Sequence, residues 1–228
     1  MKKKLCALVL AVAMSVLVLT GCEGSGSSGT IPGGSQTPGS GGVSIHLLGA
    51  TWEKSQDYTW LYYCAEVTNT NSEDAGSSKI TIMPAGTAEY TTGVAAGDTL
   101  RFSGVAYYRG SAPVNDSSVG LYIDTPAGGY SNRYNKVVRS SDLKITSSAR
   151  SGQNKIVGTL VNNGNIEAKS VRVSVLFKKN GKYIGGNHAF VRNVQPNGGT
   201  ANFEVEIYNH FKKPGVFDSY EVAAAIWS

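Results

Sequence analysis

The chain has 228 residues, of which 41% are hydrophobic and 16% are charged, and its formal net charge is +5. The first 21 residues hold three lysines and no acidic residue, so the rest of the chain carries a net charge of only +2. This nearly neutral body argues against a nucleic-acid binder, which should keep a basic stripe in its folded part. It is long enough for one large domain or two small ones.

The chain begins with a basic segment and a short apolar run. Lys2, Lys3 and Lys4 precede residues 5–19, which contain no charged side chain over 15 residues. A helix that spans a bilayer needs about 20 apolar residues. A basic start followed by so short an apolar run is typical of a cleaved signal peptide.

The apolar run ends in the string Leu19, Thr20, Gly21 and Cys22. This string resembles the lipobox of bacterial lipoproteins, in which a small residue precedes an invariant cysteine. The resemblance implies a signal peptide over 1–21, cleavage between Gly21 and Cys22, and a diacylglyceryl thioether on Cys22. Two acyl chains hold a protein stably at a membrane. We therefore expect a lipid anchor in the bacterial cell membrane and a body that faces outside the cytoplasm. The alternative is an ordinary secretory signal with a chance cysteine.

Residues 22–42 contain the lipidated cysteine and a linker. The 20 residues after Cys22 include eight glycines and five serines. Such a composition cannot bury enough apolar surface to fold. We predict a disordered, flexible tether with a reach of roughly 25 Å.

The rest of the chain contains an internal repeat. At an offset of 93 residues, AEVTNTNSEDA matches GTLVNNGNIEA, and at an offset of 101 residues, GDTLRF matches GGTANF. The eight-residue difference is a change of loop length, which folds tolerate. The aligned positions are Ala65 with Gly158, Asn69 with Asn162, Ala75 with Ala168, Ile80 and Ile82 with Val173 and Val175, Phe102 with Phe203, and Val119, Leu121 and Ile123 with Tyr220, Val222 and Ala224.

The pattern within each copy predicts β-strands. Val171, Val173 and Val175 recur at every second position, as in a strand with one buried face. Asn180 and Gly181 separate two strand-like runs. This dipeptide favours a type I′ hairpin turn, because both central residues of that turn need a positive φ.

Short strands and turn residues alternate throughout the body, and no run of residues has a convincing apolar stripe with helical spacing. Pro84 closes one strand-like run, since proline cannot donate to a sheet. We predict an all-β fold with two tandem immunoglobulin-like β-sandwich domains, over 43–135 and 136–228.

The second copy contains KIVGTLVNNGN, VRVSVLFKKNGKYIGG and VQPNGGTANFEVEI. These segments, which span roughly residues 143–227, resemble the FxLYD domain of bacterial surface proteins, although the literal Phe-x-Leu-Tyr-Asp string is absent. The resemblance implies a small immunoglobulin-like sandwich and a surface context. It implies no reaction and no catalytic residues.

Nothing in the sequence has the spacing of a catalytic or metal site. The three histidines are scattered, whereas a metal site needs three or four convergent ligands. No carboxylate cluster has the spacing of a calcium loop. We therefore predict no metal, no cofactor and no catalytic residue, and we expect a protein that is not an enzyme.

Cys64 is the only thiol left once Cys6 is removed with the signal peptide and Cys22 is lipidated, so we expect no disulfide within the body. Alternation places Tyr63 on the buried face and Cys64 on the opposite face. We interpret Cys64 as a half-buried, unreactive residue.

Aromatic residues are the best functional candidates. Alternation places Trp60 and Tyr62 away from the core, and Tyr107 and Tyr108 on opposite faces of their strand. We hypothesise that Trp60, Tyr62 and either Tyr107 or Tyr108 form a ligand patch for a glycan or a surface protein, because Tyr and Trp are enriched at interfaces. The alternative is that both faces of this sheet are covered, one of them by the other domain.

Together these observations predict a membrane-anchored bacterial surface lipoprotein that acts as a non-catalytic binding, adhesion or spacer module. Three alternatives remain open: an envelope hydrolase with an unrecognised site, a solute-binding lipoprotein of a transporter, and a purely structural stalk. The hydrolase would need a convergent polar pocket.

Overall fold

The computed structural model describes residues 28–32, 37–38, 42–91, 93–110, 119–125 and 138–227. The predicted signal peptide, the predicted cleavage and lipidation site at Cys22, and the predicted boundary between residues 135 and 136 lie outside these residues. The described part is all-β, as the sequence predicts, and all its strand pairs are antiparallel.

The first half of the body forms two sheets. Sheet I has five strands in the order β1-β3-β4-β7, with β2 also paired to β3. Its long strands are β3 (Val43–Ser55), β4 (Tyr58–Asn69) and β7 (Thr99–Arg109), and its short strands are β1 (Ser28–Pro32) and β2 (Thr37–Pro38). Sheet II has the order β6-β5-β8 and consists of β5 (Lys79–Met83), β6 (Thr87–Tyr90) and β8 (Gly120–Asp124).

The second half repeats this strand order. Sheet III, β9-β10-β13, consists of β9 (Leu143–Ser151), β10 (Lys155–Asn162) and β13 (Gly199–Glu206). Sheet IV, β12-β11-β14, consists of β11 (Ala168–Lys179), β12 (Lys182–Val194) and β14 (Ser219–Ile226). The short helices are η3 (Ser140–Asp142) and α1 (Asn209–Lys212). No helix in the described ranges is long and apolar enough to cross a membrane.

The two halves also agree in strand register, which supports the repeat found in the sequence. Residues that the alignment equates have equated partners on the neighbouring strand. The corresponding pairs are Ala65–Phe102 and Gly158–Phe203, and Ile80–Ile123 and Val173–Ala224. The aligned residues Ala75 and Ala168 also each pair with a valine, Val94 and Val194.

Asn69 and Asn162 make the same hydrogen bonds at the end of β4 and of β10, and both are fully buried. In each, the side-chain oxygen accepts from the N–H two residues later, and the amide nitrogen donates to two equivalent carbonyl oxygens; the Asn69 nitrogen also donates to the Ala95 carbonyl at 3.3 Å. The partners are Asn71, Glu73 and Val94 for Asn69, and Gly164, Ile166 and Val194 for Asn162. The asparagine therefore closes the same loop in both copies.

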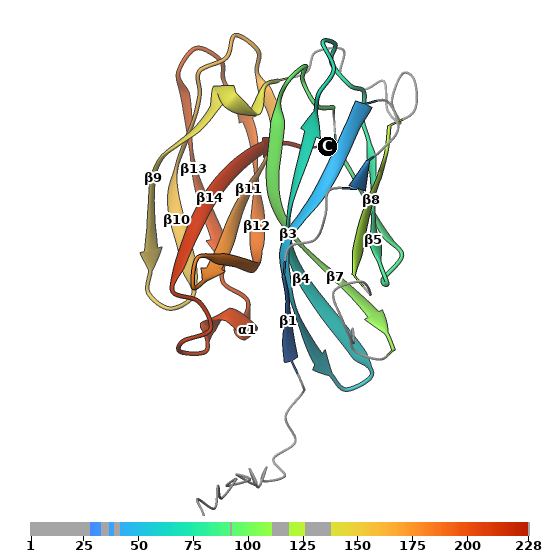
Figure 1. The fold of residues 1–228 in the computed structure, drawn as a ribbon. Coiled ribbons are helices and arrows are strands. Elements are labelled where there is room, and N and C mark those ends of the chain that lie inside the picture. Colours follow the sequence, from blue (N-terminus) through green and yellow to red (C-terminus); the bar gives the residue numbers. More distant parts are fainter. Residues whose placement is uncertain are drawn as a thin grey trace, which may run out of the picture.

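The four sheets stack in the order II, I, IV, III, with the first half on the right of Figure 1 and the second half on the left. One core lies between sheets II and I, and another lies between sheets IV and III. Trp227, just after β14, joins the first core, and Tyr62 on β4 joins the second. Sheets I and IV are thus covered on both faces, which explains why β4 and β11 are buried along most of their length.

Strand β12 crosses sheet I closely, because glycines lie at the crossing. Gly49, Gly185 and Gly186 have no side chain that would separate the two backbones. A Cβ on Gly49 would lie 2.0 Å from the Tyr183 carbonyl oxygen. A Cβ on Gly185 would lie 2.8 Å from the Tyr62 carbonyl oxygen, and one on Gly186 would lie 2.8 Å from the Ser103 Cβ. The halves therefore meet in direct backbone contact.

The predicted hairpin turn is confirmed between β11 and β12. Asn180 has φ 50° and Gly181 has φ 75°, as a type I′ turn requires. Strand β5 ends at Met83, directly before Pro84, as predicted.

The prediction of an unstructured tether over 22–42 is wrong in part. Two short strands within it, β1 (Ser28–Pro32) and β2 (Thr37–Pro38), pair with β3. Strand β3 would otherwise be an edge strand with unpaired backbone groups. Composition does not reveal this pairing, because the ladder between two strands is made by backbone groups that every residue type carries.

Replacing the buried asparagine of the second copy should destabilise the fold. We expect Asn162→Ala to lower the free energy of unfolding by about 2–3 kcal/mol, because it leaves two buried carbonyl groups and one N–H without their partner. Chemical denaturation measures this change. The matched control is Asn163→Ala, since Asn163 is exposed; equal losses in both variants would contradict the assigned role.

Candidate functional site

Two of the four predicted patch residues lie side by side on the outer end of sheet I. Trp60 on β4 pairs with Tyr107 on β7, and their ring centroids are 5.1 Å apart. Tyr107 is 58% exposed. Trp60 is half-buried, and its inner side packs against the second core.

The sequence prediction missed two neighbours of this pair, Tyr58 and Arg109. The Tyr58 ring lies 6.0 Å from the Tyr107 ring. The Arg109 guanidinium lies 5.3 Å from the centroid of the Tyr58 ring, and its Nε donates to the Tyr58 hydroxyl at 3.2 Å. Tyr58 is two residues before Trp60, so alternation could have found it, whereas Arg109 required the register of β4 and β7. We call Tyr58, Trp60, Tyr107 and Arg109 the β4–β7 aromatic cluster.

Tyr62 does not face solvent, so its predicted place in the patch is wrong. It is only 6% exposed, and its ring stacks on His210 at 5.4 Å and contacts Tyr208 and Phe211. Burial, followed by the nearby Glu53 carboxylate, raises the pKa of Tyr62 to about 12. The second half covers this part of sheet I, which is the alternative that the sequence left open.

Tyr108 lies on the other face of sheet I from Tyr107. It pairs with Thr59 on β4, and it is half-buried. Burial raises the pKa of its hydroxyl. The opposite orientation of the two tyrosines is as predicted, and only Tyr107 belongs to the exposed cluster.

Glu53 lies directly beside the aromatic cluster and is held by the second half. It pairs with Trp60 across β3 and β4. The Lys213 Nζ is 3.1 Å from Glu53 Oε1, and the His210 Nδ1 is 3.7 Å from Glu53 Oε2. Burial lowers the pKa of His210. Lys213 therefore balances the charge of Glu53 at this edge of the cluster.

Arg172 on β11 is the most unusual polar residue at the joint between the halves. Its side chain is 1% exposed and forms an ion pair with Glu89 of sheet II. The guanidinium also donates to the Ser103 carbonyl and, at 3.1 Å, to the His188 Nδ1. It lies 4.3 Å from the Trp227 ring and 5.2 Å from the Phe102 ring. Glu89 in turn accepts from the buried Tyr63 hydroxyl at 2.7 Å.

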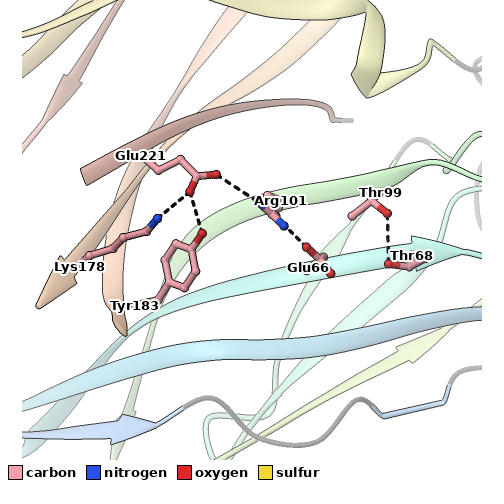
Figure 2. A network of polar contacts seen from close by, with 7 residues as sticks. All are labelled: Glu66, Thr68, Thr99, Arg101, Lys178, Tyr183 and Glu221. Carbon is pink, nitrogen blue, oxygen red and sulfur yellow. Dashed lines mark hydrogen bonds and ion pairs between the residues drawn. The ribbon is translucent and has the colours of Figure 1, made fainter. Parts of the chain in front are cut away.

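A second polar network crosses the joint closer to solvent (Figure 2). Glu221 on β14 accepts at 2.9 Å from Lys178, at 2.7 Å from Tyr183 and at 3.3 Å from Arg101 on β7. The Arg101 Nε also lies 2.7 Å from Glu66 on β4. Arg101 therefore links carboxylates of both halves.

A groove of about 530 Å³ lies next to this network, where the first half meets β14 and η3. Its polar lining includes Glu66, Asp98, Arg101 and Ser140. The carboxylates are engaged: Glu66 pairs with Arg101, and Asp98 Oδ2 accepts from the Ser140 N–H at 2.6 Å. We interpret the groove as a polar part of the contact between the two halves.

Cys64 is more deeply buried than predicted, because sheet I is covered on both faces. Its exposure is 0%, and desolvation raises its pKa. A thiol with a raised pKa is a poor nucleophile, which agrees with its interpretation as unreactive. The described ranges contain no group of three or more His, Cys, Asp or Glu residues arranged to hold a metal ion.

The chain matches no known protein-family model, and no curated protein is similar enough to be identified as its relative. Its function must therefore be inferred from its own residues.

The His188–Arg172 contact should make stability depend on pH. Desolvation and the Arg172 charge lower the pKa of His188 from 6.5 to about 4. The unfolded state then binds more protons between these values, so the free energy of unfolding should fall as pH drops from about 6.5 to 4, by roughly 3 kcal/mol from this group. Denaturation at several pH values measures the slope.

His188→Gln should flatten that slope, since glutamine keeps an acceptor for Arg172 and does not titrate. An unchanged slope in His188→Gln would show that another group is responsible.

Proposed function

We propose that the protein is a membrane-anchored bacterial surface lipoprotein whose body is a non-catalytic binding module. The lipobox-like string at Cys22 and the short apolar run before it support the anchor. The acyl chains would hold the body just outside the membrane.

The body, in this proposal, is a tandem pair of immunoglobulin-like β-sandwiches. The repeated strand order and register support two copies of one unit. The resemblance of residues 143–227 to FxLYD domains supports the same architecture. Sandwiches of this type carry no intrinsic chemistry, so the function lies in the surface they present.

The β4–β7 aromatic cluster is the observation that favours binding over a purely structural stalk. Tyr107 exposes 58% of its surface beside Trp60 and Tyr58. Exposed Tyr and Trp side chains supply large contact areas at a low entropic cost. The ligand class in this proposal is a glycan or a surface protein.

The anchor is tested by Cys22→Ser. Without the thiol no thioether can form, so we expect the variant to leave the membrane fraction and appear in the soluble or secreted fraction. Cell fractionation with immunoblotting measures the distribution. Cys64→Ser is the control and should stay in the membrane fraction; retention of Cys22→Ser there would contradict the lipoprotein assignment.

The binding surface is tested by Tyr107→Ala in a screen of glycans and surface proteins with the full chain. We expect at least a tenfold loss of affinity for any ligand found, with a change of unfolding free energy below about 1 kcal/mol because the side chain is exposed. Tyr122→Ala is the control, since Tyr122 is 54% exposed on sheet II. If Tyr107→Ala binds every ligand as the wild type does, the cluster is not the binding surface.

A further inference from the structure

The β4–β7 aromatic cluster carries a cation without an acidic partner in the described part of the chain. No carboxylate there forms an ion pair with Arg109. Its guanidinium instead lies over the Tyr58 ring and donates from Nε to the Tyr58 hydroxyl. Arg109 is exposed, so its positive charge faces the solvent beside the exposed rings.

The orientation of Arg109 leaves a defined set of donors for a ligand. The Nε–H is used by Tyr58, and the two terminal nitrogens have no partner among the described residues. These two nitrogens form a planar fork whose geometry matches a carboxylate. The ring contact restricts the movement of the side chain, so less entropy is lost when the fork binds an anion.

The rest of the cluster does not cancel this charge. Glu53, which pairs with Trp60 across β3 and β4, is balanced by Lys213 at 3.1 Å. The surface formed by Lys213, Glu53, Trp60, Tyr107 and Arg109 therefore has a net charge of about +1 with neutral rings at its centre. A ligand that complements it has an apolar face beside a negative charge.

We propose that this cluster binds a glycan that contains uronic acid. The C–H face of a pyranose ring stacks on Tyr107 and Trp60, and the sugar carboxylate accepts two hydrogen bonds from the Arg109 fork. This inference rests on the proposed binding function and names its ligand class. A carboxylate-bearing sugar combines in one residue the two features that the cluster complements, whereas a neutral sugar leaves the Arg109 fork without its partner.

The test uses two probes with the same sugar chain, polygalacturonate, whose carboxylates are free, and its fully methyl-esterified form, whose carboxylates are neutral esters. Binding to the full chain in detergent is measured by calorimetry or biolayer interferometry at low salt. We expect polygalacturonate to bind at least about tenfold more tightly than the ester, because the ester cannot form the charge-assisted pair. The preference should weaken as salt is raised.

Variants separate the role of the charge from that of the rings. Arg109→Gln should remove the preference for polygalacturonate over the ester, and Arg109→Lys should retain only part of it, because lysine keeps the charge without the fork. Tyr107→Ala should weaken binding of both probes at least tenfold. Tyr122→Ala and Arg150→Gln, an exposed arginine on sheet III, are matched controls that should bind as the wild type does.

The outcomes distinguish this inference from the proposed function. Equal binding of the two probes, or a preference that survives Arg109→Gln, would overturn the uronic-acid assignment. If the wild type binds a neutral glycan or a protein instead, and Tyr107→Ala abolishes that binding, the binding function stands and only the ligand class is wrong. If Tyr107→Ala changes no binding at all, both proposals fail.

Discussion

The buried guanidinium of Arg172 is the interaction on which the arrangement of the two halves depends. It starts on sheet IV, reaches past sheet I and ends at Glu89 of sheet II. A buried ion pair of this kind adds little net stability, because desolvation offsets the attraction, but losing one partner is costly. The pair therefore favours this placement of the halves over placements that would leave Arg172 buried without Glu89.

Direct backbone contact between β12 and sheet I is the second feature that fixes how the two halves pack. Because Gly49, Gly185 and Gly186 lack side chains, β12 rests directly on sheet I, and the packing gives sheets I and IV two covered faces each. The second half does not cover the outer end of β4 and β7. Tyr62 lies beneath α1, whereas Tyr107 is open to solvent. The aromatic cluster is thus the part of a continuous apolar face that the second half leaves uncovered.

The sequence predicted those features that depend on local pattern. Strand alternation and the Asn180–Gly181 turn depend on residues close together in the chain. The equivalence of Asn69 and Asn162 follows from the internal similarity of the two copies. Features that depend on long-range packing were missed. The burial of Tyr62 requires α1, which lies about 150 residues later in the chain. Arg109 joins the cluster only through a strand register, and β1 pairs with β3 through backbone groups that composition does not report.

Burial and charge compensation explain why Arg172 and Arg109 have opposite roles. Arg172 is enclosed by Phe102, Trp227 and the Glu89 carboxylate. The carboxylate compensates its charge within the fold, and the two aromatic rings exclude solvent. Arg109 has an aromatic ring and a hydroxyl as its partners, and these leave its charge uncompensated at the surface. A compensated cation fixes structure, whereas an exposed cation held in place by an aromatic ring keeps its attraction for an anion from outside the chain. The fold thus uses the contacts of Arg172 with Phe102 and Trp227 to join the halves and leaves the charge of Arg109 available to a ligand.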